Sequence, residues 1–214
     1  VHQGAGSLSQ AYFGDGVVVG VIDQGFDYTH PSFYDSTYTT YRVKRVWEQN
    51  ATSGTPPSGY SYGRELTNQS SILNAQRDMT TTSHGSHVAG TAAGSGAGTS
   101  GAYKGVAFKS DIVLVSTTMQ NVDIADGIEY IYNYANSVGK PCVINMSIGS
   151  HVGPHDGTSI FDQACDLMTG NGELLVGAAG NQGSDPLYIG KSYTSIDTIM
   201  YSFVEFTSSS LGTN

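Results

Sequence analysis

Three polar residues that could take part in proton transfer border apolar segments of the chain. Asp23 ends the run GVVVGVID, His84 lies near the start of SHGSHVAGTAAGS, and Asn181 ends GAAGN. An imidazole at a helix N-terminus is biased toward its neutral form by the helix dipole, as a general base requires. An amide such as Asn181 can donate to a developing oxyanion or cap a turn, and Asp23 alone is typical of a turn.

A Gly-Thr-Ser sequence at positions 157–159 offers a serine that could be a nucleophile. Its neighbours favour another role. Apolar residues recur at helical spacing from Ile160 onward, and Ser159-x-x-Asp162 resembles a capping box. Such a cap stabilises a helix by about 1 kcal/mol. We therefore predict that Ser159 begins a helix.

His84 and His87 are three residues apart, a spacing that could hold a metal ion. No Cys-rich or Glu/His motif completes a ligand set, so we predict no metal site, with a metal-dependent enzyme as the alternative. The two cysteines, Cys142 and Cys165, lie among apolar residues and are predicted to be buried free thiols.

Apolar patterning places these residues on an α/β framework. Buried strands are predicted at 16–23, 110–117, 141–149 and 173–180, and an edge or half-exposed strand at 41–49. Helices are predicted at 83–95, 121–138 and 160–170, with a short helix within 68–79. Residues 51–63 are predicted to form a loop. Alternating strands and helices predict a parallel sheet, in which functional residues gather beyond the carboxyl ends of the strands.

Composition limits the function classes. The 214 residues suffice for a single domain, and only 13% of them are charged, which argues against disorder. The net charge is −9 with 9 Lys and Arg, so no basic surface for nucleic acid or anionic membranes is expected. No apolar run approaches the roughly 18 residues of a membrane span.

The motifs VVVGVIDQG, HGSHVAGTAAG, NMSIG and GAAGN, in this order, resemble the subtilisin-like serine proteases, or subtilases. The resemblance implies a parallel sheet flanked by helices on both faces and an endopeptidase that acts through an acyl-enzyme. It implies that Asp23 orients the imidazole, that His84 is the general base and that Asn181 is the oxyanion donor. It also implies substrate binding by Ser147, Ile148 and Gly149, and by Ala179 and Gly180.

The chain departs from the family pattern in two places. Ser32 stands where many subtilases have an Asp that binds calcium, which disfavours structural calcium without excluding it, and no other cofactor is expected. Nothing after Asn181 matches the family's Gly-Thr-Ser-Met-Ala. We therefore expect a single partial peptidase domain over residues 1–214, incomplete at its C-terminal side and inactive alone. Apolar surface left uncovered would favour self-association.

The resemblance further implies a polypeptide substrate and an extracellular or cell-surface location. His155 and Asp156 follow the predicted substrate segment closely and are secondary site candidates. The alternative is a non-catalytic subtilase homologue that binds peptides or protein partners, although binding alone requires neither Asp23, His84 nor Asn181.

Overall fold

The computed structural model describes residues 2, 8–151, 153–183, 194–196 and 199. The chain divides into two compact units, Val1–Ala179 and Gly180–Asn214, and each is considered by itself. The prediction of a single domain over residues 1–214 therefore stays a prediction. Among the described residues, no helix is long and apolar enough to cross a membrane.

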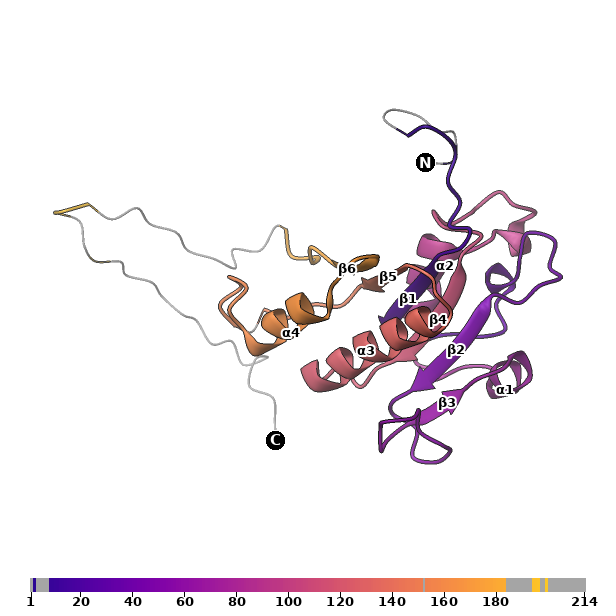
Figure 1. The fold of residues 1–214 in the computed structure, drawn as a ribbon, viewed down its shortest axis with the longest axis horizontal. Coiled ribbons are helices and arrows are strands. Elements are labelled where there is room, and N and C mark those ends of the chain that lie inside the picture. The colour runs from indigo at the N-terminus through magenta and orange to yellow at the C-terminus, as the bar shows by residue number, and fades with distance from the viewer. Residues whose placement is uncertain (1, 3–7, 152, 184–193, 197–198, 200–214) are drawn as a thin grey trace. The chain divides into compact units, whose positions relative to one another are not determined.

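The first unit is built on a six-stranded sheet with the order β3-β2-β4-β1-β5-β6 (Figure 1). The strands are β1 (Val18–Asp23), β2 (Val43–Glu48), β3 (Arg64–Leu66), β4 (Asp111–Ser116), β5 (Cys142–Met146) and β6 (Glu173–Gly177). All neighbours pair in parallel except β3, which pairs antiparallel with β2. β1 is fully buried between β4 and β5, as its β-branched run predicts.

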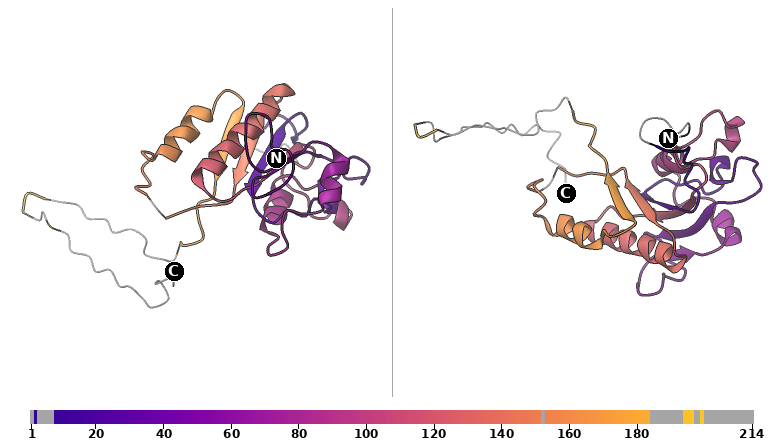
Figure 2. Two further views of the ribbon diagram at one scale, coloured as in Figure 1. Left: turned by 90° about the horizontal axis from the view of Figure 1, so that it is seen from below. Right: turned by 45° about the horizontal axis from the view of Figure 1, so that its top comes forward.

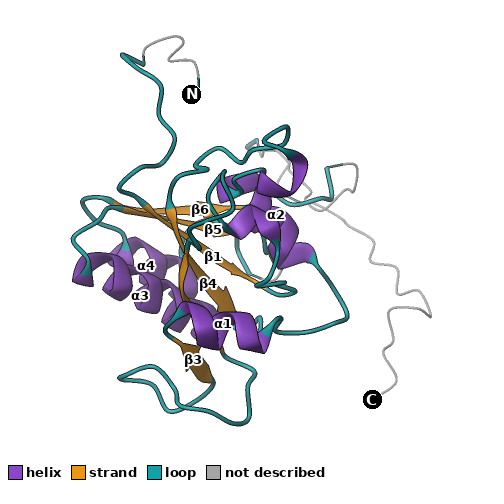
Figure 3. Ribbon diagram, turned by 90° about the vertical axis from the view of Figure 1, so that its right-hand side faces the viewer, coloured by secondary structure: helices purple, strands orange, loops and turns teal. Residues whose placement is uncertain are grey.

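Helices cover both faces of this sheet, which confirms the predicted fold class (Figures 2 and 3). They are α1 (Gln69–Ala75), α2 (His84–Ala93), α3 (Asn121–Ser137) and α4 (Ile160–Met168), with short 3₁₀ turns at Pro31–Phe33 and Ala97–Thr99. Ile72 of α1 and Ala89 of α2 share one core with Val21. Ile128 and Ile131 of α3 form the other core with Ile22, and Phe161 of α4 packs against it.

Three strand predictions need correction. The segment 141–149 forms a strand only over Cys142–Met146. The segment 41–49 is not an edge strand, because the unpredicted β3 pairs along its outer side. The segment 173–180 forms a strand only over Glu173–Gly177, and that strand is an edge rather than a buried element. Leu174 is 60% exposed, although the apolar run ELLVG is typical of a buried strand. Apolar composition predicts a strand but does not report which neighbours cover it.

The start of α4 confirms the capping role of Ser159. Its hydroxyl oxygen accepts a hydrogen bond from the Asp162 N–H (3.1 Å) and donates to the Asp162 carboxylate (2.7 Å). Both cysteines are free thiols, but only Cys142 is buried, whereas Cys165 on α4 is half-buried. Burial raises the pKa of the Cys142 thiol to about 12, which makes it unreactive at neutral pH.

Helix α2 packs closely against its surroundings at both ends. At its start, a Cβ on Gly85 would lie 2.8 Å from the Gln24 carbonyl oxygen and from the Phe26 ring. At its end, the buried Arg42 guanidinium donates to the carbonyls of Ala93 (2.6 Å) and Ser32 (2.8 Å). A cation at a helix C-terminus complements the exposed carbonyls there. The small residues at the two ends of α2, Gly85 and Ala93, therefore serve close packing.

We predict opposite effects for two glycine substitutions in α2. Gly85→Ala should lower the free energy of unfolding by about 1–3 kcal/mol, because the new methyl group meets backbone and ring atoms. Gly90→Ala, whose Cβ would meet nothing within 4 Å, should raise it by about 0.5–1 kcal/mol. Urea unfolding of both variants measures the pair, and equal effects would contradict the packing described for Gly85.

Candidate active site

The structure brings Asp23 and His84 into direct contact. The imidazole Nδ1 lies 2.8 Å from Oδ1 and 2.9 Å from Oδ2 of the Asp23 carboxyl group. The Asp23 side chain is 1% exposed, whereas that of His84 is 52% exposed. An ionised carboxylate only accepts hydrogen bonds, so the ring proton of neutral His84 is held at Nδ1. Nε2 then carries the lone pair that can accept a proton.

Opposing effects determine the pKa of the Asp23 carboxyl group. Burial raises the pKa of this carboxyl group, and hydrogen bonds from the His84 ring and the Gln24 N–H (2.7 Å) lower it in part. The pKa remains above its ordinary value because desolvation is the largest contribution. The hydrogen bond to His84 is therefore part of what makes the ionised form tolerable at this buried position.

The start of α2 docks on the turn that follows β1, and this docking sets the contact. The Gln24 carbonyl accepts from the Gly85 N–H (2.6 Å), and the Gly25 carbonyl accepts from the Ser86 N–H (3.0 Å). Gly25 has a φ of 82° and a Cβ there would lie 2.6 Å from the Thr82 carbonyl oxygen. A side chain at this position is excluded by both conformation and space.

The predicted substrate segment Ser147–Gly149 follows β5 at the same edge of the sheet. Met146, the last residue of β5, pairs with Ile22 of β1 and with Gly177 of β6. Ser147 and Ile148 are half-buried and Gly149 is exposed. Ala179, two residues beyond β6, is exposed as well. Parallel pairing therefore places this segment beside the strand end that carries Asp23.

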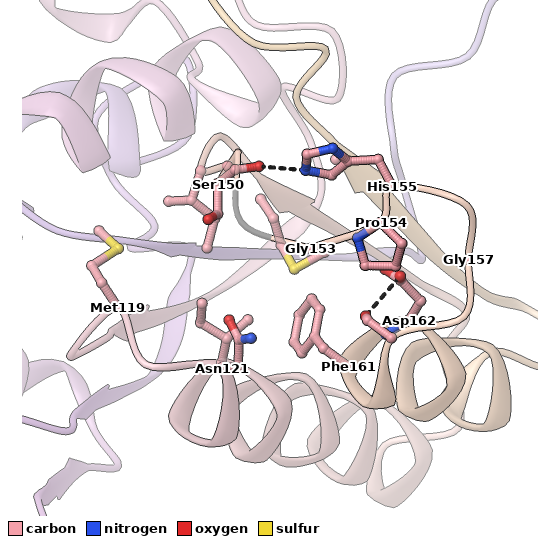
Figure 4. A pocket seen from close by; sticks show the side chains of 15 residues that line it. Met119, Asn121, Ser150, Gly153, Pro154, His155, Gly157, Phe161 and Asp162 are labelled. Atoms are coloured by element: carbon pink, nitrogen blue, oxygen red, sulfur yellow. Dashed lines mark hydrogen bonds between the residues drawn. The ribbon is translucent and has the colours of Figure 1, made fainter. Parts of the chain in front are cut away.

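A cavity of about 510 Å³ opens beside Ser147–Gly149 (Figure 4). Apolar side chains that line it are Ile124, Met146, Ile148, Phe161 and Met119, and polar lining residues include Asn121, Ser150, His155, Ser159 and Asp162. At its rim, the His155 ring nitrogen Nε2 contacts the Ser150 carbonyl oxygen at 3.2 Å (Figure 4). His155, a secondary site candidate, lines the cavity. Asp156, which follows His155 in the chain, is not among the lining residues.

Sequence reasoning missed the contribution of the helices to this cavity. Helical spacing on α4 predicts core packing for Phe161, whereas the sequence does not single out Ile124 on α3. Ile124 lies in the core, and Phe161 packs against it. Only the tertiary arrangement reveals that the same side chains reach the cavity. The positive φ of Met119 (69°) and of His155 (53°) could not be read from the sequence either.

Gly180 and Asn181 belong to the second unit, so their placement relative to Asp23 and His84 is not described. Within their unit both are exposed, and the Asn181 N–H donates to the Gln182 side-chain oxygen at 3.0 Å. The assignment of Asn181 as oxyanion donor and of Gly180 to substrate binding therefore stays a prediction.

The metal hypothesis gains no support from the described residues. They contain no group of three or more His, Cys, Asp or Glu side chains arranged to hold a metal ion. At the doubtful calcium position, the Ser32 N–H donates to the His30 ring (3.2 Å) and its carbonyl accepts from Arg42 (2.8 Å). Ser32 is thus part of the packing around Arg42.

Known proteins share both sequence and fold with this chain. Residues 14–204 match the sequence pattern of the subtilase family. The chain is 28% identical to subtilisin-like protease 9 of Arthroderma otae, over 86% of this chain and 39% of the relative. It is 30% identical to the thermophilic serine proteinase of Bacillus sp. strain AK1, over 85% and 37%. The chain thus spans about two-fifths of the length of these curated relatives.

Solved structures agree with this similarity. The Clostridium perfringens CspB protease superimposes with a TM-score of 0.66 at 26% identity, over 80% of this chain and 37% of that protein. The S41 psychrophilic protease does so with a TM-score of 0.55 at 26% identity, over 78% and 47%. The sheet and helices described above are therefore those of subtilisin-like proteins.

We predict that Asp23→Asn changes how stability depends on pH. Because the pKa of Asp23 is raised on folding, the wild type should lose stability as pH rises from the ordinary carboxyl pKa of 3.8 to the raised value. Asp23→Asn should lack that loss, so its free energy of unfolding should rise relative to wild type as the pH increases above 3.8.

Asp35→Asn is the matched control with the opposite sign. Hydrogen bonds from Thr39 and Thr37 hold the pKa of the exposed Asp35 well below its ordinary value, so this carboxylate stabilises the fold more as pH rises. Urea unfolding across the pH range measures both variants. A parallel pH dependence for Asp23→Asn and wild type would contradict the raised pKa.

Proposed function

Because this chain belongs to the subtilase family, we propose that it supplies the acid–base pair and part of the substrate site of a serine endopeptidase. The observation that carries the proposal is the buried Asp23 carboxylate held 2.8 Å from Nδ1 of the half-exposed His84 ring. A structural ion pair needs no accessible Nε2, whereas a general base does. Activity and substrates of the whole protein are part of this proposal.

In the proposed mechanism, Asp23 fixes the neutral tautomer of His84 and stabilises the imidazolium that forms during the reaction. Nε2 takes the proton from a serine hydroxyl as the hydroxyl oxygen attacks the peptide carbonyl carbon. The imidazolium then gives this proton to the leaving amine, and the acyl-enzyme remains for hydrolysis by water. Asn181 would stabilise the oxyanion. Loss of one such donor lowers kcat by about 10²–10³, a magnitude measured in subtilisin itself.

The nucleophile in this proposal is not Ser159. Its hydroxyl is engaged with Asp162 on both its donor and its acceptor side, at the N-terminus of α4. Ser159 also precedes Asn181, and no Gly-Thr-Ser-Met-Ala occurs in the 214 residues. We therefore propose that the nucleophilic serine lies outside this chain and that the chain alone is inactive.

The cavity beside Ser147–Gly149 is proposed to take an apolar side chain of the polypeptide substrate. An extended peptide that pairs with a free backbone segment projects alternate side chains toward the protein surface. The apolar lining by Ile124, Ile148 and Phe161 favours a hydrophobic side chain there. Specificity of the protein would then depend partly on α3 and α4.

An extracellular or cell-surface location is the remaining part of the proposal. It is supported by the low Lys and Arg content together with family membership. Immunodetection in fractionated cultures of the source organism tests it, and recovery only from the cytoplasmic fraction would refute it.

A fluorophosphonate probe tests the nucleophile. The 214-residue chain should show no covalent labelling, because its Gly-Thr-Ser serine caps a helix and its hydroxyl is engaged with Asp162. Denaturing gel electrophoresis with fluorescence detection measures the result, with Ser159→Ala as the control for adventitious labelling. Labelling that Ser159→Ala abolishes would overturn our interpretation. The whole protein should be labelled, and its His84→Ala variant should not. A whole protein that resists the probe would favour the non-catalytic homologue.

Substrate preference tests the cavity. In the whole protein, Ile124→Ala should shift kcat/KM toward peptides with larger apolar side chains by about tenfold, because a missing methylene group in such a pocket changes binding by about 1–3 kcal/mol. Val122→Ala, on the same helix but 71% exposed and outside the cavity, should leave the preference unchanged. Equal preferences in both variants would remove the cavity from the substrate site.

Uncovered apolar side chains on the described part of the sheet lead us to propose self-association of the isolated chain. Leu174 and Val176 are exposed on the edge strand β6, and Ile160 and Leu167 on α4. Exposed edge strands with apolar side chains are templates for pairing with another chain. Sedimentation velocity should show concentration-dependent oligomers that Leu174→Lys weakens. A monomer at every accessible concentration would refute the proposal.

A further inference from the structure

Asp78, in the loop between α1 and α2, gathers four hydrogen-bond donors around one carboxyl group. Oδ1 accepts from the backbone N–H groups of Phe26 (2.7 Å) and Met79 (2.8 Å). Oδ2 accepts from the Gly25 N–H (2.9 Å) and from the Ser116 hydroxyl (2.6 Å). A carboxylate has about four lone-pair sites and no donor, so this set of partners fits the ionised form.

Three of these partners belong to the turn that carries Asp23 and to the strand beside it, whereas Met79 is the neighbour of Asp78 in the chain. Gly25 and Phe26 follow Asp23 in the chain, and Ser116 is its register partner on β4. Asp78 therefore joins the turn to the end of β4. The opposite side of the turn is held by α2, whose N–H groups bind the carbonyls of Gln24 and Gly25.

We infer that Asp78 is a positioning residue that fixes the turn after β1, so that the Asp23 carboxylate is held against the His84 imidazole. It acts through Asp23 and is not itself in contact with the imidazole. The inference rests on the proposed function for its catalytic meaning. The contact that it explains, between Asp23 and His84, lies entirely within this chain.

The charge of Asp78 has a second effect on the same carboxyl group. Asp78 adds to the rise in the pKa of Asp23 that burial causes, while His84 on α2 and the Gln24 N–H act in the opposite direction. Asp78 therefore helps to hold Asp23 in place, while its negative charge disfavours ionisation of the Asp23 carboxyl group. A residue that only stabilised the loop between α1 and α2 would not affect the positions of the Asp23 carboxyl group and the His84 imidazole.

Asp78→Asn in the 214-residue chain separates these possibilities. An Asn side chain has one acceptor oxygen and turns its NH₂ toward backbone donors, so the bonds to one side of the turn are lost together with the charge. We expect the low-field proton resonance of the His84 Nδ1–H to weaken or disappear. Circular dichroism must show a folded chain. The ¹³C-detected Asp23 titration then reports two opposing effects, because loss of the Asp78 charge lowers the Asp23 pKa and a loosened His84 hydrogen bond raises it.

Asp35→Asn is the matched control, since Asp35 also accepts hydrogen bonds from nearby N–H and hydroxyl groups of Thr37 and Thr39. It should change neither reading, because Asp35 has no bond to the turn after β1. A folded Asp78→Asn chain with the wild-type His84 resonance would overturn the inference, whatever its Asp23 titration.

Asp78→Glu and Ser116→Ala decide the question if Asp78→Asn does not fold. Both keep the carboxylate charge while they disturb the link between Asp78 and its partners. Faster solvent exchange of the His84 Nδ1–H in both variants supports positioning, and the Asp23 pKa should rise with it because the His84 hydrogen bond that lowers this pKa is loosened. Wild-type exchange in both variants overturns it. These signals do not depend on a nucleophile, so failure of the probe experiment leaves them interpretable.

Discussion

The burial of one carboxylate at the end of β1 is the constraint on which the site depends. Asp23 is almost completely enclosed, so its charge is tolerable only while hydrogen bonds from His84 and from the backbone compensate for lost water. Those bonds require the start of α2 to approach the turn after β1 at backbone contact. Gly25 and Gly85 permit this approach because neither position has room for a Cβ.

The rest of the first unit keeps α2 in that place. Arg42 binds carbonyls near the C-terminal end of the helix, and the small residues along it pack against the sheet in a common core with Val21. Asp78 closes the opposite side of the turn with bonds to Gly25 and Phe26. The geometry of the acid–base pair thus results from packing at both ends of one short helix.

The parallel sheet brings the proposed substrate segment to the same edge by register rather than by direct contact. β5 lies next to β1, so Ser147–Gly149 emerges beside the strand end that carries Asp23. Helices α3 and α4, on the face opposite α2, line the cavity near this segment. The helix on one face of the sheet therefore positions His84 against Asp23. The helices on the other face line the cavity proposed for a substrate side chain.

The sequence by itself determined most of the elements and singled out the Asp23 and His84 side chains that the structure brings together. Continuous apolar runs, helical spacing and a capping serine predict β1, β4, α3 and α4, because these signals depend on local preferences. The motifs around Asp23 and His84 indicate the family. The sequence could not show that β6 is an edge strand with exposed Leu174, nor that β3 covers β2, because burial depends on neighbours distant in the chain. Only the tertiary structure decided that Asp78 binds the turn of Asp23 and that Ile124 and Phe161 line a cavity. Their roles arise from contacts between segments many residues apart, for which no local pattern exists.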